Sequence, residues 1–346
     1  MTWNGDAAAV LGWATLAALL SWLGAWTVCR IAPRLGLVAA PNARSSHQLP
    51  TPHGGGLGMV LAGSVIGGWL AWSRELPLLG GVLILAGLLA LVGLCDDFRP
   101  LPAGLRLTAQ AVLCAAMLGL MGLLPAPGGG LPLMLGGGLF AFWFLSGLWW
   151  VNLFNFMDGI DGFAGTEALF MLAVAALLAL WGHPERLVHP VWMLMPCLAA
   201  ASAGFLRINW PPARVFMGDV GSTWMAFMIF AFTLMTIQAG WIVPTVWLIL
   251  GAGFMSDASV TLVVRMVTGQ RFTQAHRSHA YQRLARRWGG HRPVTLLLAA
   301  FNVLWLAPLA VAAQWSPQWS GLWLGLAFTP ALLGVWHAGA GKTDGR

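Results

Sequence analysis

Residues 77–97 read PLLGGVLILAGLLALVGLCDD, an uninterrupted apolar run that ends in two neighbouring carboxylates. An α-helix needs about 20 predominantly apolar residues to cross the hydrocarbon core of a bilayer. The segment from 77 to 94 therefore predicts a transmembrane helix. The pair Asp96 and Asp97, which follows Cys95, marks the membrane surface at which that helix ends.

Similar apolar runs recur along the whole chain between short polar or Pro/Gly-rich breaks. Of 346 residues, 58% are hydrophobic and only 8% are charged, whereas a soluble domain has roughly a quarter charged. This composition excludes a water-soluble fold. We expect an all-α, polytopic membrane protein with about eleven transmembrane helices. The expected spans lie near residues 7–28, 56–72, 77–94, 107–124, 132–151, 164–181, 190–206, 221–237, 241–264, 293–313 and 319–337.

The distribution of cations gives this chain an orientation. Asp6 is the only charged residue before Arg30, so we expect the first span to be retained with its N-terminus outside. The other loops then follow by alternation, and of the 18 Lys and Arg residues only Arg74 and Arg186 fall outside. This asymmetry agrees with the positive-inside rule and predicts a cytoplasmic C-terminus. The net charge of +7 is spread over several loops with no soluble basic domain, which argues against a nucleic-acid partner.

Seven acids lie at or just inside the cytoplasmic ends of the predicted spans. A carboxylate within an apolar segment usually has a partner, a bound cation or a function. Several in one plane indicate a metal site, although Glu167 or Asp257 taken alone could equally be a helix cap or an interfacial ion pair. The seven are Asp96, Asp97, Asp158, Asp161, Glu167, Asp219 and Asp257.

Three of the cytoplasmic motifs are acidic. A pair such as Asp96 and Asp97 can hold Mg²⁺, or one member can bind metal while the other orients or deprotonates a nucleophile. The segment 152–162, NLFNFMDGIDG, supplies amides, acids and glycines suited to a nucleotide or a hydrated cation, but lacks the pattern of an EF-hand. Asp219 begins a span near Ser222, where it could be an N-cap or a metal ligand.

Two further motifs suit anions. The segments 41–47 and 50–56 combine hydroxyls, an arginine, histidines and glycines before a helix, which is the chemistry of a phosphate cradle but not a Walker A loop. His276 and His279, three residues apart in the most basic loop, can share a helix face and bind zinc or phosphates. We favour phosphates, because zinc would need further His or thiolate ligands that this loop lacks.

Together these motifs, over roughly residues 30 to 285, resemble the polyprenyl-phosphate N-acetylhexosamine-1-phosphate transferases of glycosyltransferase family 4. That family initiates O-antigen and related glycans and includes the translocase that makes lipid I. The resemblance implies one polytopic transferase domain over residues 1–346 of a bacterial inner membrane protein. Its active site would be cytoplasmic and formed by loops near 29–55, 95–106, 152–163, 207–220 and 265–292.

The resemblance also implies a reaction and the residues that perform it. A polyprenyl phosphate, such as undecaprenyl phosphate, would attack a UDP-N-acetylhexosamine with Mg²⁺ or Mn²⁺ as cofactor, releasing UMP. A homodimer is left open. The implied catalytic residues are Asp96, Asp97, His276 and His279; the substrate-binding residues are Arg44, His47, Thr51, Asn152, Asn155, Asp158, Asp161 and Arg277; and the metal ligands are Asp219 and Asp161.

The chain departs from the family at two places. His53 stands before the glycines where relatives often have Arg, and the three consecutive His typical of the lipid I enzyme are missing. The second departure favours a small UDP-N-acetylhexosamine over a muramyl-pentapeptide donor. An ion- or proton-coupled transporter is the alternative from another class, with Glu167 and Asp257 as relay residues. A CDP-alcohol phosphotransferase is a second enzymatic alternative, but its D-G-x-x-A-R signature is absent.

Overall fold

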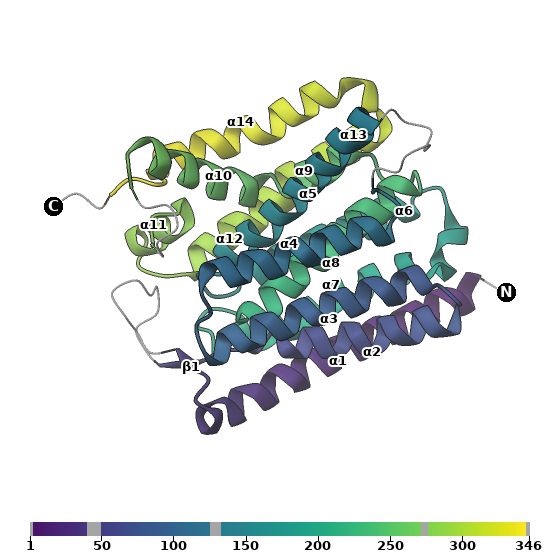
Figure 1. The fold of residues 1–346 in the computed structure, drawn as a ribbon, viewed down its shortest axis with the longest axis horizontal. Helices are drawn as coiled ribbons and strands as arrows, with labels where there is room; N and C mark the ends of the chain where they lie inside the picture. The colour runs from purple at the N-terminus through teal and green to yellow at the C-terminus, as the bar shows by residue number, and fades with distance from the viewer. Residues whose placement is uncertain (1–2, 40–49, 125–132, 271–275, 344–346) are drawn as a thin grey trace.

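The protein is a bundle of helices that run side by side between two ends (Figure 1). This computed structural model describes residues 3–39, 50–124, 133–270 and 276–343. The expectation of an all-helical, polytopic membrane protein is confirmed. The helices are α1 (Trp3–Leu35), α2 (Leu57–Ser73), α3 (Pro77–Phe98), α4 (Ala103–Leu120), α5 (Leu133–Phe156), α6 (Phe163–Leu180), α7 (Pro190–Asn209), α8 (Asp219–Gln238), α9 (Pro244–Leu250), α10 (Ala252–Val267), α11 (Ala280–Arg287), α12 (Arg292–Phe301), α13 (Ala307–Trp315) and α14 (Ser320–Ala338).

Short elements join or continue these helices. Strands β1 (Val38–Ala39) and β2 (Thr51–Pro52) pair antiparallel. Three-residue-per-turn helices η1 (Pro184–Val188) and η3 (Pro317–Trp319) lie in connections, and a π-helical turn η2 (Asn302–Leu306) links α12 to α13.

Within the described residues, nine apolar helices are long enough to cross a membrane, and a bent pair makes up to ten. The shorter helix α2, of 17 residues, runs between the same two ends beside α1 and α3 (Figure 1). With α2 and the bent pair included, each of the eleven expected spans corresponds to a helical element of the bundle.

One expected span is not a continuous helix. The segment predicted at 241–264 is divided into α9 and α10, which meet at Gly251 with a bend of 70°. Glycine weakens a helix because its backbone is unusually free. A side chain at Gly251 would also press against the ring of Trp150, 3.1 Å from an added Cβ, so the bend and the packing of α5 depend on the same small residue.

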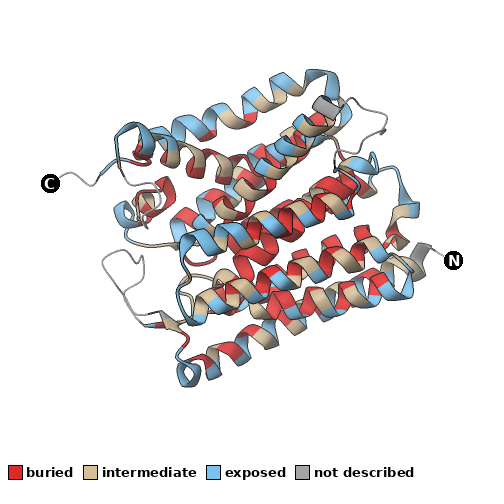
Figure 2. Ribbon diagram, in the orientation of Figure 1, coloured by how far each residue is buried: buried red, intermediate tan, exposed pale blue. Residues whose placement is uncertain are grey.

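Helix α8 forms the centre of the bundle. Its residues from Val220 to Phe232 are buried almost without exception, and Figure 2 shows the buried residues concentrated on the inner helices while α14 is largely exposed. Because α8 is apolar all round, it needs neighbours on every side. Its first residue, Asp219, is therefore surrounded by the ends of several other helices.

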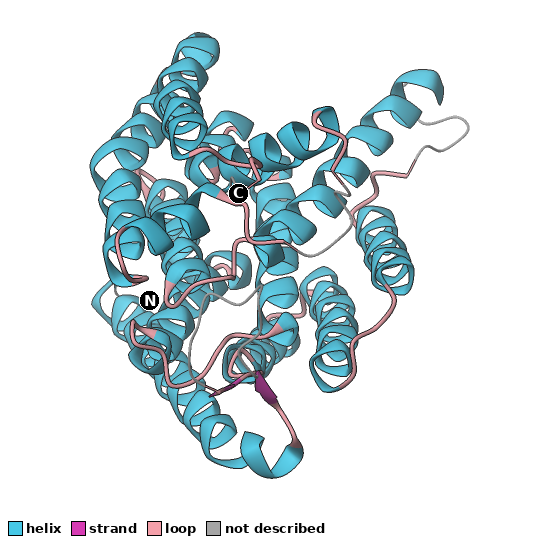
Figure 3. Ribbon diagram, turned by 90° about the vertical axis from the view of Figure 1, so that its left-hand side faces the viewer, coloured by secondary structure: helices cyan, strands magenta, loops and turns pink. Residues whose placement is uncertain are grey.

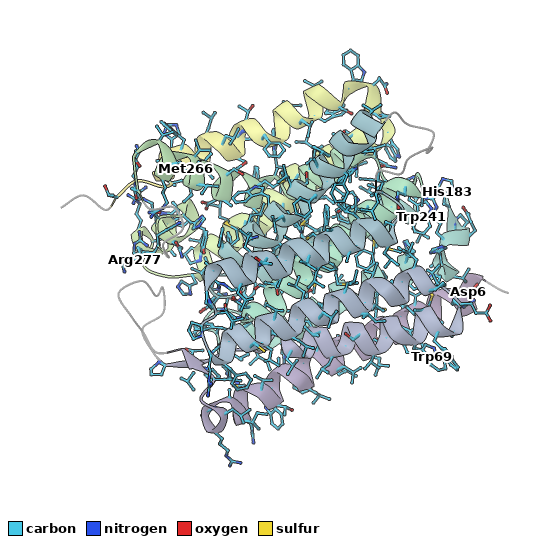
Figure 4. All side chains as sticks on the ribbon, viewed as in Figure 1. Asp6, Trp69, His183, Trp241, Met266 and Arg277 are labelled. Carbon is cyan, nitrogen blue, oxygen red and sulfur yellow. The ribbon has the colours of Figure 1, made fainter. Side chains whose placement is uncertain are left out.

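The two ends of the bundle differ in charge. We call the end at which α1, α3, α5 and α7 finish the basic end, because every described Lys and Arg except Arg74 and Arg186 lies there. Figure 4 shows Arg277 at this end, and Asp6 and His183 at the other. Viewed along the bundle from the basic end, the loops and the two strands cover the helix ends (Figure 3).

Helices α3 and α5 continue past the ends that the apolar runs predict. Helix α3 continues to Phe98 rather than 94, and α5 to Phe156 rather than 151. Asp96, Asp97 and the two asparagines Asn152 and Asn155 therefore lie on final helical turns and not in loops. Their polar groups find partners on α4 and α8, as described below, and these contacts allow the helices to continue past the apolar segment.

Candidate active site

The described parts of the five predicted loops lie at the basic end of the bundle. Hydrogen bonds join Gly55 to Phe216 and the backbone of Asp219 to Asp97, at 2.8 and 2.9 Å. Asn155 reaches the Asp219 carboxylate at 2.9 Å, and the hydroxyl of Tyr281 donates to a carbonyl at the end of α5 at 2.8 Å. These contacts bring residues from all five predicted segments together at one end of the bundle.

Asp97 caps the N-terminus of α8. Its two carboxylate oxygens accept hydrogen bonds from the backbone N–H groups of Asp219 and Val220, at 2.9 and 3.1 Å, and His53 Nδ1 lies 3.5 Å away. A carboxylate at this position satisfies N–H groups that have no partner within the helix and faces the positive end of its dipole. These contacts favour a role of Asp97 in positioning α8. Its predicted catalytic role stays a prediction.

Asp96 and Asp219 share one cation. A guanidinium nitrogen of Arg106, on α4, lies 2.7 Å from Asp96 Oδ2 and 3.4 Å from Asp219 Oδ2. The other oxygen of Asp96 accepts a hydrogen bond from Leu101 N at 2.6 Å. Of these acids, Asp219 has the most exposed side chain, at 28%, against 9% for Asp96 and 6% for Asp97. Asp219 is therefore the member that can best contact a ligand.

The two asparagines of α5 have different surroundings. Asn155 donates to Asp219 Oδ1 and to Ser222 Oγ, both at 2.9 Å, and so fixes the orientation of the Asp219 carboxylate. Asn152 donates instead to Gln110 Oε1 on α4 at 2.7 Å and to Leu148 O. The amide of Asn152 therefore joins α5 to α4, and its predicted contact with the substrate stays a prediction.

The two acids of the loop after α5 also separate into different roles. The Asp158 carboxylate has no hydrogen bond to any described residue. Enclosure by protein, and then the negative charges of Asp219, Asp97 and Asp161, raise its pKa well above the ordinary value for aspartate. A nearby cation stabilises the charged form of a carboxylate that is enclosed by protein and surrounded by other acids.

Asp161, by contrast, is already engaged. Its Oδ1 lies 3.1 Å from His291 Nδ1 and its Oδ2 accepts a hydrogen bond from Ala213 N at 3.0 Å. Its carbonyl oxygen accepts a further bond from the Thr295 hydroxyl at 2.9 Å. These contacts join the 157–162 loop to α12 and to the loop before α8. They do not support the prediction of Asp161 as a metal ligand or substrate contact, because both carboxylate oxygens face protein groups.

His276 and His279 come together, but not on a helix face. Both precede α11, and their rings stack with centroids 5.0 Å apart. Burial, followed by the nearby His279 and Arg265, lowers the pKa of His276 to about 4, so it is neutral at pH 7. Because Ser278 N donates to Nδ1 of His276, the hydrogen of the neutral ring is assigned to Nε2. His276 can therefore act as a neutral hydrogen-bond donor to a phosphate.

Asp257 positions His279 and α11. Its carboxylate accepts hydrogen bonds from Ala280 N and Tyr281 N, both at 2.9 Å, and lies 3.2 Å from His279 Nδ1. This arrangement supports the interpretation of Asp257 as a helix cap. The cap comes from α10, the preceding helix, and orients the segment that carries both histidines.

The remaining predicted residues are less closely defined by contacts. Arg277 lies at the basic end (Figure 4), where its carbonyl accepts a hydrogen bond from Arg286 and its side chain is half-buried. Thr51 is buried on strand β2, which does not favour direct contact with a substrate. Arg44 and His47 lie outside the described residues.

Small residues allow the site to close. An added Cβ at Gly93, on α3, would lie 2.5 Å from Asp219 O and 2.7 Å from Val220 N, so only glycine lets α3 approach the start of α8 this closely. At Gly159 the space is filled by the Tyr281 hydroxyl and not left for a ligand.

The N–H groups of Gly55 and Gly56 donate to the carbonyls of Phe216 and Met217. They are thus not available for the predicted phosphate cradle.

The carboxylates fit a divalent cation only in part. Among the described residues, no preformed group of three His, Cys, Asp or Glu ligands is present. However, Asp96 and Asp219 both face a single guanidinium nitrogen, and Asp158 lacks a partner. Oxygen ligands supplemented by substrate phosphates and water are typical of Mg²⁺ sites. Asp219, with Asp96 or Asp158, could therefore hold such an ion together with a bound phosphate.

Sequence reasoning missed three residues of this region. Arg106, Gln110 and His291 each pair with a predicted site residue that lies on another helix or in another loop. Arg106 carried one usable signal, since it is a cation at the start of a span just after the Asp96-Asp97 pair. The partners of Gln110 and His291 depend on which helices become neighbours.

Comparison with known proteins identifies the family. The sequence model described as Glycosyl transferase family 4 matches residues 79–237, which include Asp96, Asp97, Asn155 and Asp219. The undecaprenyl-phosphate alpha-N-acetylglucosaminyl 1-phosphate transferase of Salmonella typhi is 30% identical over 305 residues, covering 83% of this chain and 79% of the relative. This chain belongs to glycosyl transferase family 4.

Other members of the family are similar over comparable lengths. The decaprenyl-phosphate N-acetylglucosaminephosphotransferase of Mycobacterium tuberculosis is 28% identical over 337 residues, covering 87% of this family 4 chain and 80% of the relative. A probable undecaprenyl-phosphate N-acetylglucosaminyl 1-phosphate transferase of Bacillus subtilis is 27% identical over 285 residues, covering 78% and 76%. The resemblance inferred from the motifs is thereby confirmed.

Proposed function

We propose that this family 4 protein transfers N-acetylhexosamine 1-phosphate from a UDP-sugar to a polyprenyl phosphate such as undecaprenyl phosphate. An oxygen of the polyprenyl phosphate attacks the β-phosphorus of the donor. The bond between that phosphorus and the bridging oxygen breaks, and UMP leaves with the bridging oxygen. The product, a polyprenyl-diphospho-sugar, would be the first lipid-linked intermediate of an envelope glycan such as O-antigen.

The observation that carries this proposal is the cluster around Asp219. Asp219, Asp96, Asn155 and Arg106 come from four different helices and meet at one end of an apolar bundle. An acceptor with a long isoprenoid tail presents its phosphate at that depth. The similar proteins named above are all polyprenyl-phosphate sugar-phosphate transferases, and membership in their family supports the same reaction here.

The main difficulty of this reaction is electrostatic, because two anions must approach each other. Bound Mg²⁺ or Mn²⁺ would neutralise phosphate charge and polarise the donor diphosphate. Asp219, with Asp96 or Asp158, would hold the ion, and Asn155 keeps the Asp219 carboxylate oriented toward it. A bound ion would also stabilise the charged form of Asp158, whose pKa is raised first by burial and then by the nearby acids.

The groups that remain would bind the substrates. Arg277 supplies a cation and His276 a neutral hydrogen-bond donor at the same end of the bundle, and both suit the donor diphosphate. Arg106, on α4 beside Asp96 and Asp219, supplies a second cation that could contact the phosphate of the acceptor. We assign the basic end to the cytoplasm of a bacterial inner membrane, on the basis of the positive-inside rule.

A reconstituted reaction tests the proposal. Purified protein with Mg²⁺, undecaprenyl phosphate and radiolabelled UDP-N-acetylglucosamine should give a solvent-extractable labelled lipid and an equal amount of UMP. A panel that includes UDP-N-acetylgalactosamine identifies the donor. EDTA should abolish the product and excess Mg²⁺ or Mn²⁺ restore it.

Two variants provide the controls. Asp219→Asn should lower the rate by at least about a hundredfold, since it removes a charge that acts on the reacting phosphates. Asp6→Asn is the matched control, because Asp6 lies at the opposite end of the bundle (Figure 4) and should leave the rate unchanged. Full activity of Asp219→Asn, or activity in EDTA, would contradict the metal assignment.

The transporter alternative loses its basis. Asp257, one of its two relay residues, is occupied by capping α11. Glu167 is buried and accepts a hydrogen bond from Asn302 at 2.6 Å, which gives it a local partner on the neighbouring helix. The relatives named above are transferases.

A further inference from the structure

A separate cavity of about 630 Å³ lies at the basic end, where α1 and α7 finish. None of the carboxylates of the candidate active site lines it. Its walls combine three tryptophans with three arginines: Trp22, Trp26, Arg30, Arg207, Trp210 and Arg214.

The α1 wall has a graded polarity. Trp22, Trp26 and Arg30 are spaced four residues apart and therefore form one stripe along the helix. The Arg30 guanidinium stacks 4.2 Å above the ring of Trp26. Because a helix rises about 1.5 Å per residue, Trp22 lies roughly 12 Å deeper in the bundle than Arg30. The cavity is thus cationic at the surface and aromatic toward the membrane interior.

The three arginines have no anionic partner. Arg30, Arg207 and Arg214 are exposed, and none forms an ion pair with any part of the chain that the structure describes. Arg214 is held in place through its backbone, since its N–H donates to Ile208 O at 2.9 Å and its carbonyl accepts from the Cys29 thiol at 3.3 Å. The backbone that carries this cation is therefore fixed before any ligand arrives.

We propose that this cavity binds the phosphate headgroup of an anionic phospholipid from the adjoining leaflet. The phosphodiester lies among the three guanidiniums, which are strong hydrogen-bond donors to phosphate. The acyl chains run along Trp26 and Trp22 toward the membrane interior. This proposal is independent of the proposed transferase reaction, because it concerns a different surface and a lipid that is not consumed.

Lipid binding to the purified, detergent-solubilised chain tests the site. Native mass spectrometry measures the affinity for phosphatidylglycerol and for phosphatidylcholine with the same acyl chains. Each arginine near a phosphate contributes about fivefold in affinity. The triple variant Arg30→Gln, Arg207→Gln, Arg214→Gln should therefore bind the first phosphatidylglycerol about a hundredfold more weakly, and each single variant about fivefold more weakly.

A second triple variant separates a built site from general charge attraction. Arg287→Gln, Arg292→Gln and Lys342→Gln remove the same charge from exposed positions at the basic end that do not line the cavity. This control should keep the affinity of the unmodified chain for phosphatidylglycerol. An equal loss in the control, or equal affinity for phosphatidylcholine, would overturn the proposal.

Competition distinguishes the lipid from the reaction's acceptor. Undecaprenyl phosphate at the same concentration should leave the first phosphatidylglycerol bound. If it displaces that lipid, the cavity belongs to the acceptor and the assignment to a phospholipid is wrong. The single variants keep the test valid if the triple variant does not fold.

Discussion

Replacing Asp97 by Asn should destabilise the protein, whereas replacing Asp219 by Asn should not. The two acids lie at the same helix start but differ in what they contact. Asp97 accepts hydrogen bonds from the first two N–H groups of α8 at 2.9 and 3.1 Å. Asp219 carries a side chain that is more exposed and is close to the like charges of Asp96 and Asp97.

The size of the effect follows from the lost contacts. Asn at position 97 keeps one acceptor oxygen and turns its amide toward the N–H of Val220. The lost charge-assisted hydrogen bond is worth about 1.5–3 kcal/mol, and the lost interaction with the helix dipole about 0.3–1 kcal/mol. Asp97→Asn should therefore lower the free energy of unfolding by about 2–4 kcal/mol. Asp219→Asn should change it by less than about 1 kcal/mol, since it also removes repulsion between neighbouring acids.

Thermal unfolding of the purified variants in one detergent measures this difference, with transferase rates determined on the same samples. At roughly 2 °C per kcal/mol for a chain of this size, Asp97→Asn should unfold about 4–8 °C below the unmodified protein. Both variants should lose activity, but only Asp97→Asn should lose stability. An inactive Asp97→Asn variant with unchanged thermal stability would refute the capping role and would favour the predicted catalytic role of Asp97.

Four further changes probe the elements that position the site. Asp257→Asn should lower kcat/KM about tenfold, because it removes a charge-assisted cap worth about 1.5 kcal/mol from the helix after the two histidines. Initial rates measure kcat/KM, and an unchanged value would contradict the positioning role of Asp257. Tyr281→Phe should cost about 1 kcal/mol of stability by removing the hydrogen bond to the end of α5, and an equally stable variant would contradict that contribution. Gly93→Ala should reduce both stability and activity, measured by thermal unfolding and initial rates, because its Cβ collides with the first turn of α8; a neutral result would mean that α3 and α8 can move apart freely. Burial lowers the pKa of His276 from 6.5 to about 4, so as pH falls the unfolded chain takes up a proton before the folded protein does. Stability is therefore lost between pH 6.5 and about 4, and His276→Gln should reduce that loss by roughly 1 kcal/mol after allowance for solvent screening. An identical pH profile of thermal unfolding in the variant would contradict the pKa shift.

The acidic motifs could be located from the sequence, but their roles could not. Asp97, Asp219 and Asp257 are all acids near the ends of predicted spans. In the structure Asp97 caps a helix that begins 122 residues later, Asp257 caps the next helix along the chain, and Asp219 has the most exposed side chain of the acidic cluster. The difference depends on which helix end arrives opposite each carboxylate, and a local pattern of residues does not contain that information.

The positions at which the helices end also could not be predicted from the sequence alone. The apolar run ending near Leu94 predicts where a helix leaves the hydrocarbon, yet α3 continues through Asp96 and Asp97. It can do so because Arg106 and the N-terminus of α8 satisfy the two carboxylates. The pair His276 and His279 was likewise correctly linked, but by stacking before α11 rather than along a helix face.

The sequence by itself determined the class of fold, the approximate limits of the spans and their alternation, and the set of motifs at one end. A membrane-spanning helix satisfies its backbone hydrogen bonds within its own segment, so these properties are local and can be read from hydropathy and charge. Only the tertiary structure decided the bend at Gly251, the pairing of Asp161 with His291 and the position of Arg106 between two acids. Each of these depends on contacts between helices distant along the chain, whose geometry is determined by how side chains pack and not by their order in the sequence.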